Sequence, residues 1–171
     1  MSPQTYKEQD FEEHISGHLL ASGYYKQISG VYYKDLCLIP SEVLQFIQSS
    51  QPKEYEKLTR QYSSDTPHKL CYRLAKEVDK RGTLQVLRKG FKDRGAKFRL
   101  AYFKPSSGMN PEHQKLFAQN RFSIVRQLKY SKRNENSLDV TIFLNGLPII
   151  TAELKNSLTG QFVENAIKQY K

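Results

Sequence analysis

The sequence predicts a mixed α/β fold of the α+β kind, in which helices flank a central β-sheet. Three observations support this prediction. Amphipathic helical patterns fill much of the first half of the chain, alternating strand patterns follow, and a hairpin with an Asn-Gly turn lies near the end. Such an order of elements is typical of one sheet covered by helices. With 171 residues, the chain has the length of one domain with a real core.

The first half of the chain is dominated by helical patterns. Apolar spacing and capping residues predict these helices: residues 8–21 with Phe11, Ile15 and Leu19 facing inward, a helix from Pro40 with Ser41 as N-cap, residues 53–62, and a helix with Pro67 in its first turn that ends at Gly82. Residues 35–39 are the best strand-like run before these helices, and residues 83–88 fit either a helical turn or a strand. The helical region, about residues 40–81, is interpreted as an insertion.

The second half alternates between apolar and polar residues. The elements that we predict here are a polar turn over 90–95, a strand over 97–103, a short helix from Asn110-Pro111 to Ala118, a strand over 122–130 with Phe122, Ile124, Leu128 and Tyr130 on one face, and a helix over 161–171. Between the last two lies the hairpin, with strands over 138–144 and 147–154. Its turn, Asn145-Gly146, is the strongest short-range hairpin signal.

Positive charge is concentrated in one block of the chain. The net charge is +10 and the pI is near 9.5. Residues 69–104 contain twelve lysines or arginines and three acids. A block of this kind suits a polyanionic partner, because phosphate contacts supply most non-specific affinity for nucleic acids. The alternative is a solvated face of a basic protein.

Two further observations bear on the environment of the chain. We find no apolar run long enough for a membrane span and no signal-peptide pattern in the first residues, so no membrane association is expected. Cys37 and Cys71 fit no disulfide or metal framework. We interpret both as small buried hydrophobic residues in a reducing cytoplasm.

The hairpin carries three charged residues in an otherwise apolar stretch. Asp139 lies early in the first strand, and Glu153 and Lys155 end the second. Because the turn folds the second strand back on the first, both acids are expected at the same end of the hairpin. Mg²⁺ prefers carboxylate and water oxygens, and a nearby lysine can stabilise developing negative charge. The pattern predicts a site for phosphodiester hydrolysis, with a surface ion pair as the alternative.

The pattern Asp139…Glu153-x-Lys155 resembles the PD-(D/E)xK nuclease motif. Three longer stretches, Leu74–Pro105, Asn120–Asn156 and Leu158–Lys171, resemble the N-terminal region of the restriction (R) subunit of type I restriction-modification enzymes. This resemblance implies a restriction-endonuclease-like sheet and Mg²⁺-dependent cleavage of double-stranded DNA, with Mn²⁺ as a possible substitute. It also implies partners, namely the modification and specificity subunits. ATP is expected to act only through motor domains that are absent from residues 1–171, so the isolated fragment is expected to be weak or inactive.

The resemblance also assigns site residues. It implies that Asp139 and Glu153 bind metal and that Lys155 is catalytic. Glu12 matches the acid of the first helix in such folds, with Glu13 as its rival. Gln169 is the best match to a Gln-x-x-x-Tyr element whose tyrosine would fall beyond Lys171. The complete set predicted to bind DNA is Arg88, Lys89, Lys92, Arg94, Arg121, Arg126 and Gln169.

Two alternative functions remain open from the sequence. The chain could be a non-catalytic module of nuclease-like fold that docks DNA or partner subunits through its basic block. A weaker alternative is a nuclease for structured nucleic acids, such as a junction resolvase. The resemblance across the helical region argues against the latter.

Overall fold

The computed structural model describes residues 8–106 and 110–154. The helices in these ranges are α1 (Glu8–Ala21), α2 (Pro40–Ser50), α3 (Pro52–Tyr62), α4 (Thr66–Arg81), α5 (Thr83–Lys89) and α6 (Pro111–Phe117). The strands are β1 (Tyr25–Gln27), β2 (Phe91–Asp93), β3 (Ala96–Phe98), β4 (Phe122–Lys129), β5 (Ser137–Leu144) and β6 (Leu147–Ala152). Short 3₁₀ helices cover Ser29–Val31 and Ser63–Asp65. The mixed α/β prediction is confirmed.

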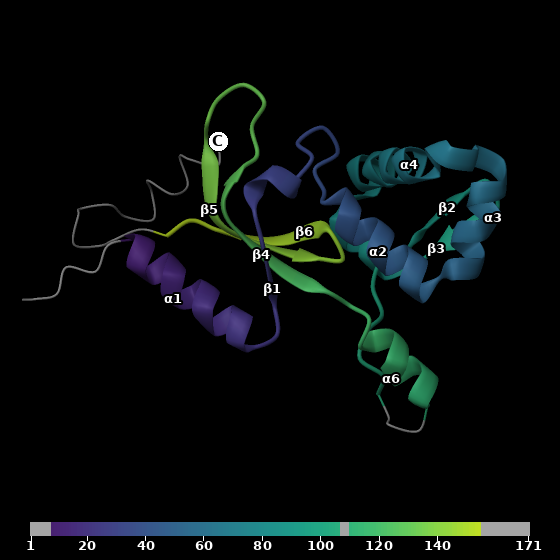
Figure 1. Ribbon diagram of the computed structural model, residues 1–171, viewed down its shortest axis with the longest axis horizontal. Coiled ribbons are helices and arrows are strands. Elements are labelled where there is room, and N and C mark those ends of the chain that lie inside the picture. The colour runs from purple at the N-terminus through teal and green to yellow at the C-terminus, as the bar shows by residue number, and fades with distance from the viewer. Residues whose placement is uncertain (1–7, 107–109, 155–171) are drawn as a thin grey trace, which may run out of the picture.

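The main sheet has four strands in the order β1-β4-β5-β6. The short strand β1 runs parallel to β4, and the other neighbours are antiparallel. Figure 1 shows this sheet with α1 in one part of the molecule and α2, α3 and α4 with the β2-β3 hairpin in another. We call the second part, residues 40–98, the helical lobe.

Helix α1 lies against one face of the sheet. Its residues Ile15 and Leu19 pack against buried Ile124 of β4 and Val140 of β5. The predicted helix boundaries are confirmed, but Phe11 is wrong as an inward residue because 53% of it is exposed. Of the three residues predicted to face inward, Ile15 and Leu19 therefore contribute to the core and Phe11 does not.

The faces of β4 differ from the simple alternation predicted for it. Ile124 belongs to the cluster under α1, whereas Leu128 packs with Val125 and Phe143 in a different cluster. Between them Gln127 has a positive φ of 50°. This left-handed residue breaks the two-residue period, so Ile124 and Leu128 do not share a face as predicted.

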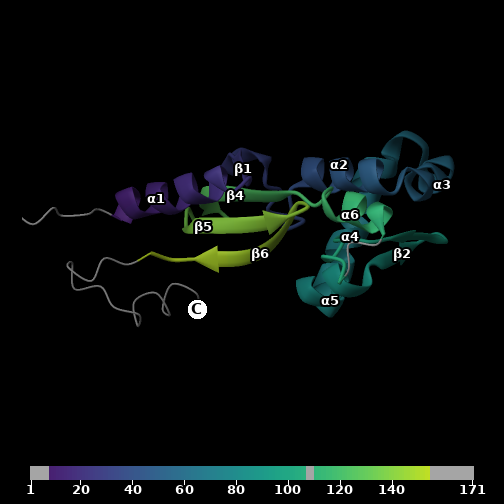
Figure 2. The same cartoon turned by 90° about the horizontal axis from the view of Figure 1, so that it is seen from below.

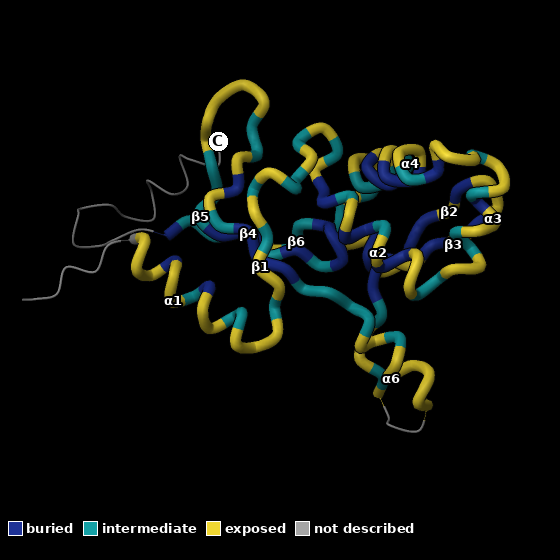
Figure 3. The backbone as a smooth tube through the Cα atoms, viewed as in Figure 1, coloured by how far each residue is buried: buried dark blue, intermediate teal, exposed yellow. Residues whose placement is uncertain are grey.

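The helical lobe has its own apolar core, which extends to the turn of the β5-β6 hairpin. Phe46, Leu58, Leu70 and Phe98 are among its buried residues, and Leu147 at the start of β6 completes it. Figure 3 shows buried segments running from the sheet into the lobe, while much of α1 and α6 remains exposed. The predicted helices α2, α3 and α4 are confirmed, and the helical run continues through α5 to Lys89.

The predicted Asn145-Gly146 turn is confirmed, and it is buried. Asn145 and Gly146 both have positive φ, as a tight hairpin turn of this type requires. The Asn145 side chain donates to the carbonyl of Leu100 and accepts from the N–H of Arg121. The Gly146 carbonyl accepts from the N–H of Ile39, directly before α2. The turn thus joins the sheet to the helical lobe.

Several local predictions are wrong. Residues 34–37 form a turn closed by a bridge between Tyr33 and Leu38, so the predicted strand-like run over 35–39 is not a strand. Ser41 is not the N-cap of α2, because Ile39 holds that position and Pro40 follows it. Cys71 is buried as predicted, and burial raises the pKa of its thiol to about 12, but Cys37 is exposed.

Some strand positions and lengths also differ from the prediction. Residues 91–93, predicted as part of a polar turn, form β2, and β3 ends at Phe98 instead of residue 103. Strand β6 ends at Ala152, two residues before the predicted end. The short helix α6 is confirmed, with Asn110 as a cap whose side chain accepts from two backbone N–H groups. The predicted helix over 161–171 lies outside the described residues.

None of the helices in the described ranges is long and apolar enough to cross a membrane.

Candidate functional site

The register of the β5-β6 hairpin brings two predicted site residues to one end. Val140 pairs with Ala152, the last residue of β6, so Asp139 and Glu153 each lie one residue beyond this pair, at the same end of the hairpin. The expectation that the two acids return to the same end is confirmed as a matter of geometry. Lys155, which the sequence places two residues further on, lies outside the described residues.

Asp139 is held by two hydrogen bonds. The backbone N–H of Leu154 donates to Oδ2 at 2.7 Å, and the side-chain amide of Gln127 donates to Oδ1 at 3.2 Å. The first bond ties Asp139 to the segment that carries Glu153. The second ties it to β4. The carboxylate therefore has a defined position at the open end of the hairpin.

Helix α1 adds a buried carboxylate beside Asp139, which is itself half-buried. Only 2% of Glu12 is exposed, and its Oε1 accepts from the Gln127 amide at 2.7 Å. Its Oε2 forms an ion pair with Arg126 at 3.2 Å. Glu13 is exposed. Of the two rival acids of the first helix, Glu12 is the one that lies close to Asp139.

Gln127 connects these acids and was not predicted from the sequence. Its amide nitrogen donates to both Glu12 and Asp139, while its amide oxygen accepts from the Ser137 hydroxyl at 2.8 Å. Its positive φ is uncommon for a residue with a side chain. A glutamine in an alternating strand carries no sequence signal for such a role, so only the fold reveals it.

The carboxylate oxygens at this end of the hairpin are the type of ligand atom that a hard divalent cation binds. Glu12 and Asp139 direct carboxylate oxygens at one amide nitrogen, a donor that partly offsets their negative charge. Mg²⁺ binds one or two carboxylates and completes its shell with water or phosphate oxygens. In the described part of the chain, no group of three histidine, cysteine, aspartate or glutamate residues is arranged to hold a metal. Within the described residues, this end of the hairpin therefore holds two neighbouring carboxylates, Glu12 and Asp139, that share one amide donor.

Two arginines predicted to bind DNA are engaged in ion pairs. Arg126 pairs with Glu12, and Arg121 pairs with Glu42 of α2 at 3.4 Å. The Arg121 guanidinium also lies 3.6 Å from the centroid of the Tyr25 ring. These contacts give both arginines a structural role within the fold, and DNA binding by them stays a prediction.

Glu42 is a buried acid that was not predicted from the sequence. It is 2% exposed and accepts from Ser123 at 2.7 Å and from Gln27 at 2.8 Å, in addition to its pair with Arg121. A glutamate in the first turn of a helix is ordinarily a surface residue, so its burial has no local signal. Its partners come from β1 and β4 and fix α2 against the sheet.

The other predicted DNA-binding cations lie in the helical lobe. Arg88 and Lys89 end α5, and Lys92 and Arg94 lie on and after β2; all four are exposed. Figure 2 shows α5 and β2 at the opposite end of the molecule from α1. The structure does not bring these cations together with the acids of the hairpin. Gln169 lies outside the described residues.

Comparison with known families gives one result. A family model described as the Type I restriction enzyme R protein N terminus matches residues 39–171. The chain belongs to this family. The family places the chain in the context of a restriction-modification system, as the resemblance implied. The matched residues include the helical lobe, β4 and the hairpin acids, whereas α1 with Glu12 precedes them. No curated protein and no solved structure matches the chain.

Proposed function

We propose that this domain is the Mg²⁺-dependent endonuclease of a type I restriction enzyme and that it hydrolyses phosphodiesters of double-stranded DNA. The observation that carries the proposal is that Asp139 and Glu153 lie at the same end of the hairpin, with buried Glu12 sharing the Gln127 amide with Asp139. Membership of the R-subunit family gives these acids a context in which DNA cleavage is expected. ATP-driven translocation is assigned to motor domains of the same subunit.

In this proposal Asp139 and Glu153 are the metal ligands, phosphate and water oxygens complete the metal's shell, and Glu12 lies beside Asp139 on the same Gln127 amide. When bound, Mg²⁺ supplies charge for the phosphate oxygens and lowers the pKa of a bound water. The chain's own contribution is positioning: the Leu154 N–H orients Asp139, and Gln127 and Arg126 orient Glu12. Lys155 is proposed to stabilise negative charge that develops on the phosphate during hydrolysis.

The test is the variant Asp139→Asn in the R subunit of the assembled restriction enzyme. Removing one carboxylate charge weakens the metal site, so we expect DNA cleavage to fall about 100-fold or more. Plasmid linearisation with ATP and Mg²⁺ measures this. ATP hydrolysis should be retained, which shows that the complex still assembles and binds DNA.

The matched control is Asp79→Asn on α4, where the aspartate is exposed. It makes the same chemical change away from the hairpin and should leave cleavage within twofold of the unmodified enzyme. An Asp139→Asn enzyme that cleaves DNA within threefold of the unmodified enzyme contradicts the proposal. Such a result would favour the alternative, a docking module of nuclease-like fold.

That alternative has one observation in its favour. The exposed cations Arg88, Lys89, Lys92 and Arg94 lie far from the hairpin acids, so DNA or a partner subunit could be held without reaching those acids. In a pure docking module, charge reversal at these four residues abolishes association while Asp139→Asn has no effect on any activity of the complex.

A further inference from the structure

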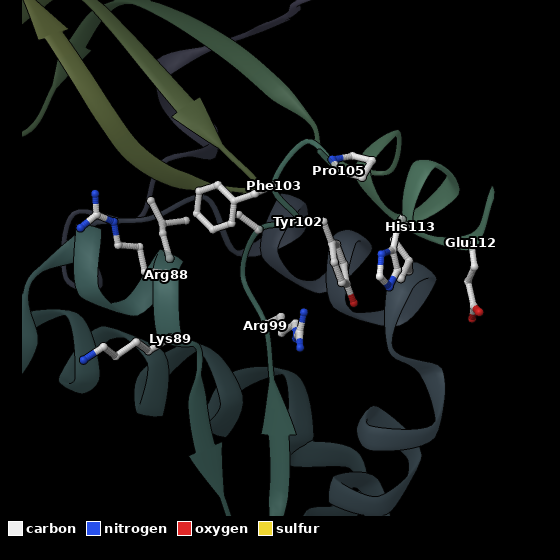
Figure 4. Close-up of a pocket in the computed structure, with 11 residues that line it drawn as sticks. Arg88, Lys89, Arg99, Tyr102, Phe103, Pro105, Glu112 and His113 are labelled. Carbon is white, nitrogen blue, oxygen red and sulfur yellow. The ribbon is translucent and has the colours of Figure 1, made fainter. Parts of the chain in front are cut away.

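A pocket of about 650 Å³ lies between α5, the segment that follows β3, and α6. Figure 4 shows this pocket. It lies in a different part of the molecule from the hairpin acids, and it belongs to none of the site residues assigned to metal or hydrolysis. Pockets of this size accommodate small organic ligands such as a single nucleotide.

Three cations line the pocket without being neutralised by the described part of the fold. Arg88, Lys89 and Arg99 are exposed, and their side chains form no hydrogen bond or ion pair with residues 8–106 or 110–154. Among the lining residues that the structure describes, Glu112 is the only acid. Figure 4 shows the guanidinium of Arg99 on the same side as the Tyr102 and His113 rings, while Lys89 extends outward at the rim. This balance favours an anionic ligand.

An aromatic side chain at the same pocket is exposed to solvent. Phe103 is 65% exposed, an unusual position for a large apolar ring. Tyr102, by contrast, packs on Phe46 with a ring distance of 5.8 Å and is part of the wall. A free aromatic face beside cations is the combination that binds a base and its phosphate together, because rings stack on bases of any sequence.

The backbone that carries these groups is fixed in place. The N–H of Arg99 donates to the Gln51 side chain at 2.7 Å, and its carbonyl accepts from the same amide at 2.9 Å. The N–H of Tyr102 donates to Asn120 at 3.1 Å, and the Tyr102 carbonyl accepts from the same side chain. Arg99 and Phe103 therefore project from an anchored segment, which limits the entropy lost when a ligand binds.

We propose that this pocket binds one nucleotide, with its phosphate at Arg99 and its base stacked on Phe103. The nucleotide can be an unpaired residue of a DNA single strand or a free nucleoside phosphate, since both offer the same chemistry. This site goes beyond the proposed function, because it needs neither metal nor the hairpin acids.

The chain offers a direct optical test, since it contains no tryptophan. Phe103→Trp introduces a single indole at the predicted stacking position. Titration of this variant of the 171-residue chain with single-stranded oligo-thymidine, in EDTA and low salt, should quench the tryptophan fluorescence as bases stack. Adding Arg99→Ala to that variant should weaken binding about tenfold, whereas Lys26→Ala, which removes a charge from exposed β1, should change it less than twofold.

A second measurement needs no tryptophan and separates the effect of the aromatic ring of Phe103 from the effect of its apolar surface. With a labelled oligo-thymidine and fluorescence anisotropy, Phe103→Leu should weaken binding about tenfold and Phe103→Tyr should bind like the unmodified chain. Equal affinity of Phe103→Leu and the unmodified chain, or equal affinity for oligo-thymidine and an abasic strand of the same length, overturns the proposal.

Thymidine monophosphate and ATP form the remaining arms. Quenching by either, with no response to the oligonucleotide, assigns the pocket to a free nucleotide; quenching by the oligonucleotide alone assigns it to a strand. No quenching by any of these ligands overturns the proposal. Because cleavage is tested with Asp139→Asn and binding is tested without metal, failure of one proposal is distinguishable from failure of the other.

Discussion

At the scale of single residues, buried carboxylates hold the sheet to its surroundings. Glu12 ties α1 to β4 through Gln127 and Arg126, and Glu42 ties α2 to β4 through Ser123 and Arg121. A buried charge is tolerated only where partners replace the lost water. The two acids thus determine where each helix meets the strand that carries their partners.

This arrangement predicts a large effect of Glu42→Ala on stability. The substitution leaves Arg121, Ser123 and Gln27 without their shared acceptor, and breaking a buried pair of this kind costs about 3 kcal/mol. Urea denaturation followed by circular dichroism measures the loss. Glu13→Ala, at an exposed position of α1, should change the free energy of unfolding by less than about 0.5 kcal/mol. Similar values for the two variants would contradict the structural role of Glu42.

At the scale of elements, the turn between β5 and β6 meets the start of α2 at close range. A Cβ atom added to Gly146 would lie 2.5 Å from the carbonyl oxygen of Ile39 and 2.9 Å from the amide nitrogen of Val43, and the residue has a φ of 83°. Both a side chain and a different backbone conformation are therefore excluded here. Gly146 is therefore required both by the hairpin turn and by the close contact of that turn with the start of α2.

We expect Gly146→Ala to lower the free energy of unfolding by about 2–4 kcal/mol, because steric overlap adds to the cost of positive φ. Gly23→Ala is the matched control. Gly23 has a φ of 89°, but nothing lies within 4 Å of its added Cβ, so this variant isolates the conformational part at about 1 kcal/mol. Thermal or urea unfolding of both variants gives the difference; equal losses would show that the close approach does not matter.

At the scale of the whole molecule, the hairpin acids and the exposed cations of the helical lobe lie at opposite ends. The hairpin acids are close to α1, and the exposed cations are on α5 and around β2. If double-stranded DNA contacts the second region through phosphates, its affinity must fall steeply with salt. Charge separation of this kind makes DNA binding and hydrolysis separately testable.

Replacing both Lys92 and Arg94 with alanine should reduce the slope of log affinity against log salt concentration by about 2, one for each lost phosphate contact. Binding of labelled duplex DNA over a salt series measures the slope. The control replaces exposed Lys26 and Arg133 with alanine, which removes the same charge outside the helical lobe and should leave the slope unchanged. A slope near zero for the unmodified chain would refute phosphate binding by this region.

The sequence predicted the elements whose signals are local. Helix α1, the Asn110 cap and the Asn145-Gly146 turn follow from spacing and turn chemistry, and the hairpin acids follow from that turn. The turn over residues 34–37, the positive φ of Gln127 and the burial of Glu42 did not follow from the sequence. Each of these depends on contacts with distant segments, which override local preference.

The parallel pairing of β1 with β4 has a consequence for how the chain folds. Tyr25 pairs with Ser123, and the entire helical lobe lies between them in sequence. The ends of so long a loop meet at a high entropic cost unless the intervening segment is already compact. We therefore expect the lobe to form first and the four-stranded sheet to close last. Pulse-labelled hydrogen exchange during refolding should then protect amides of α4 before those of β4.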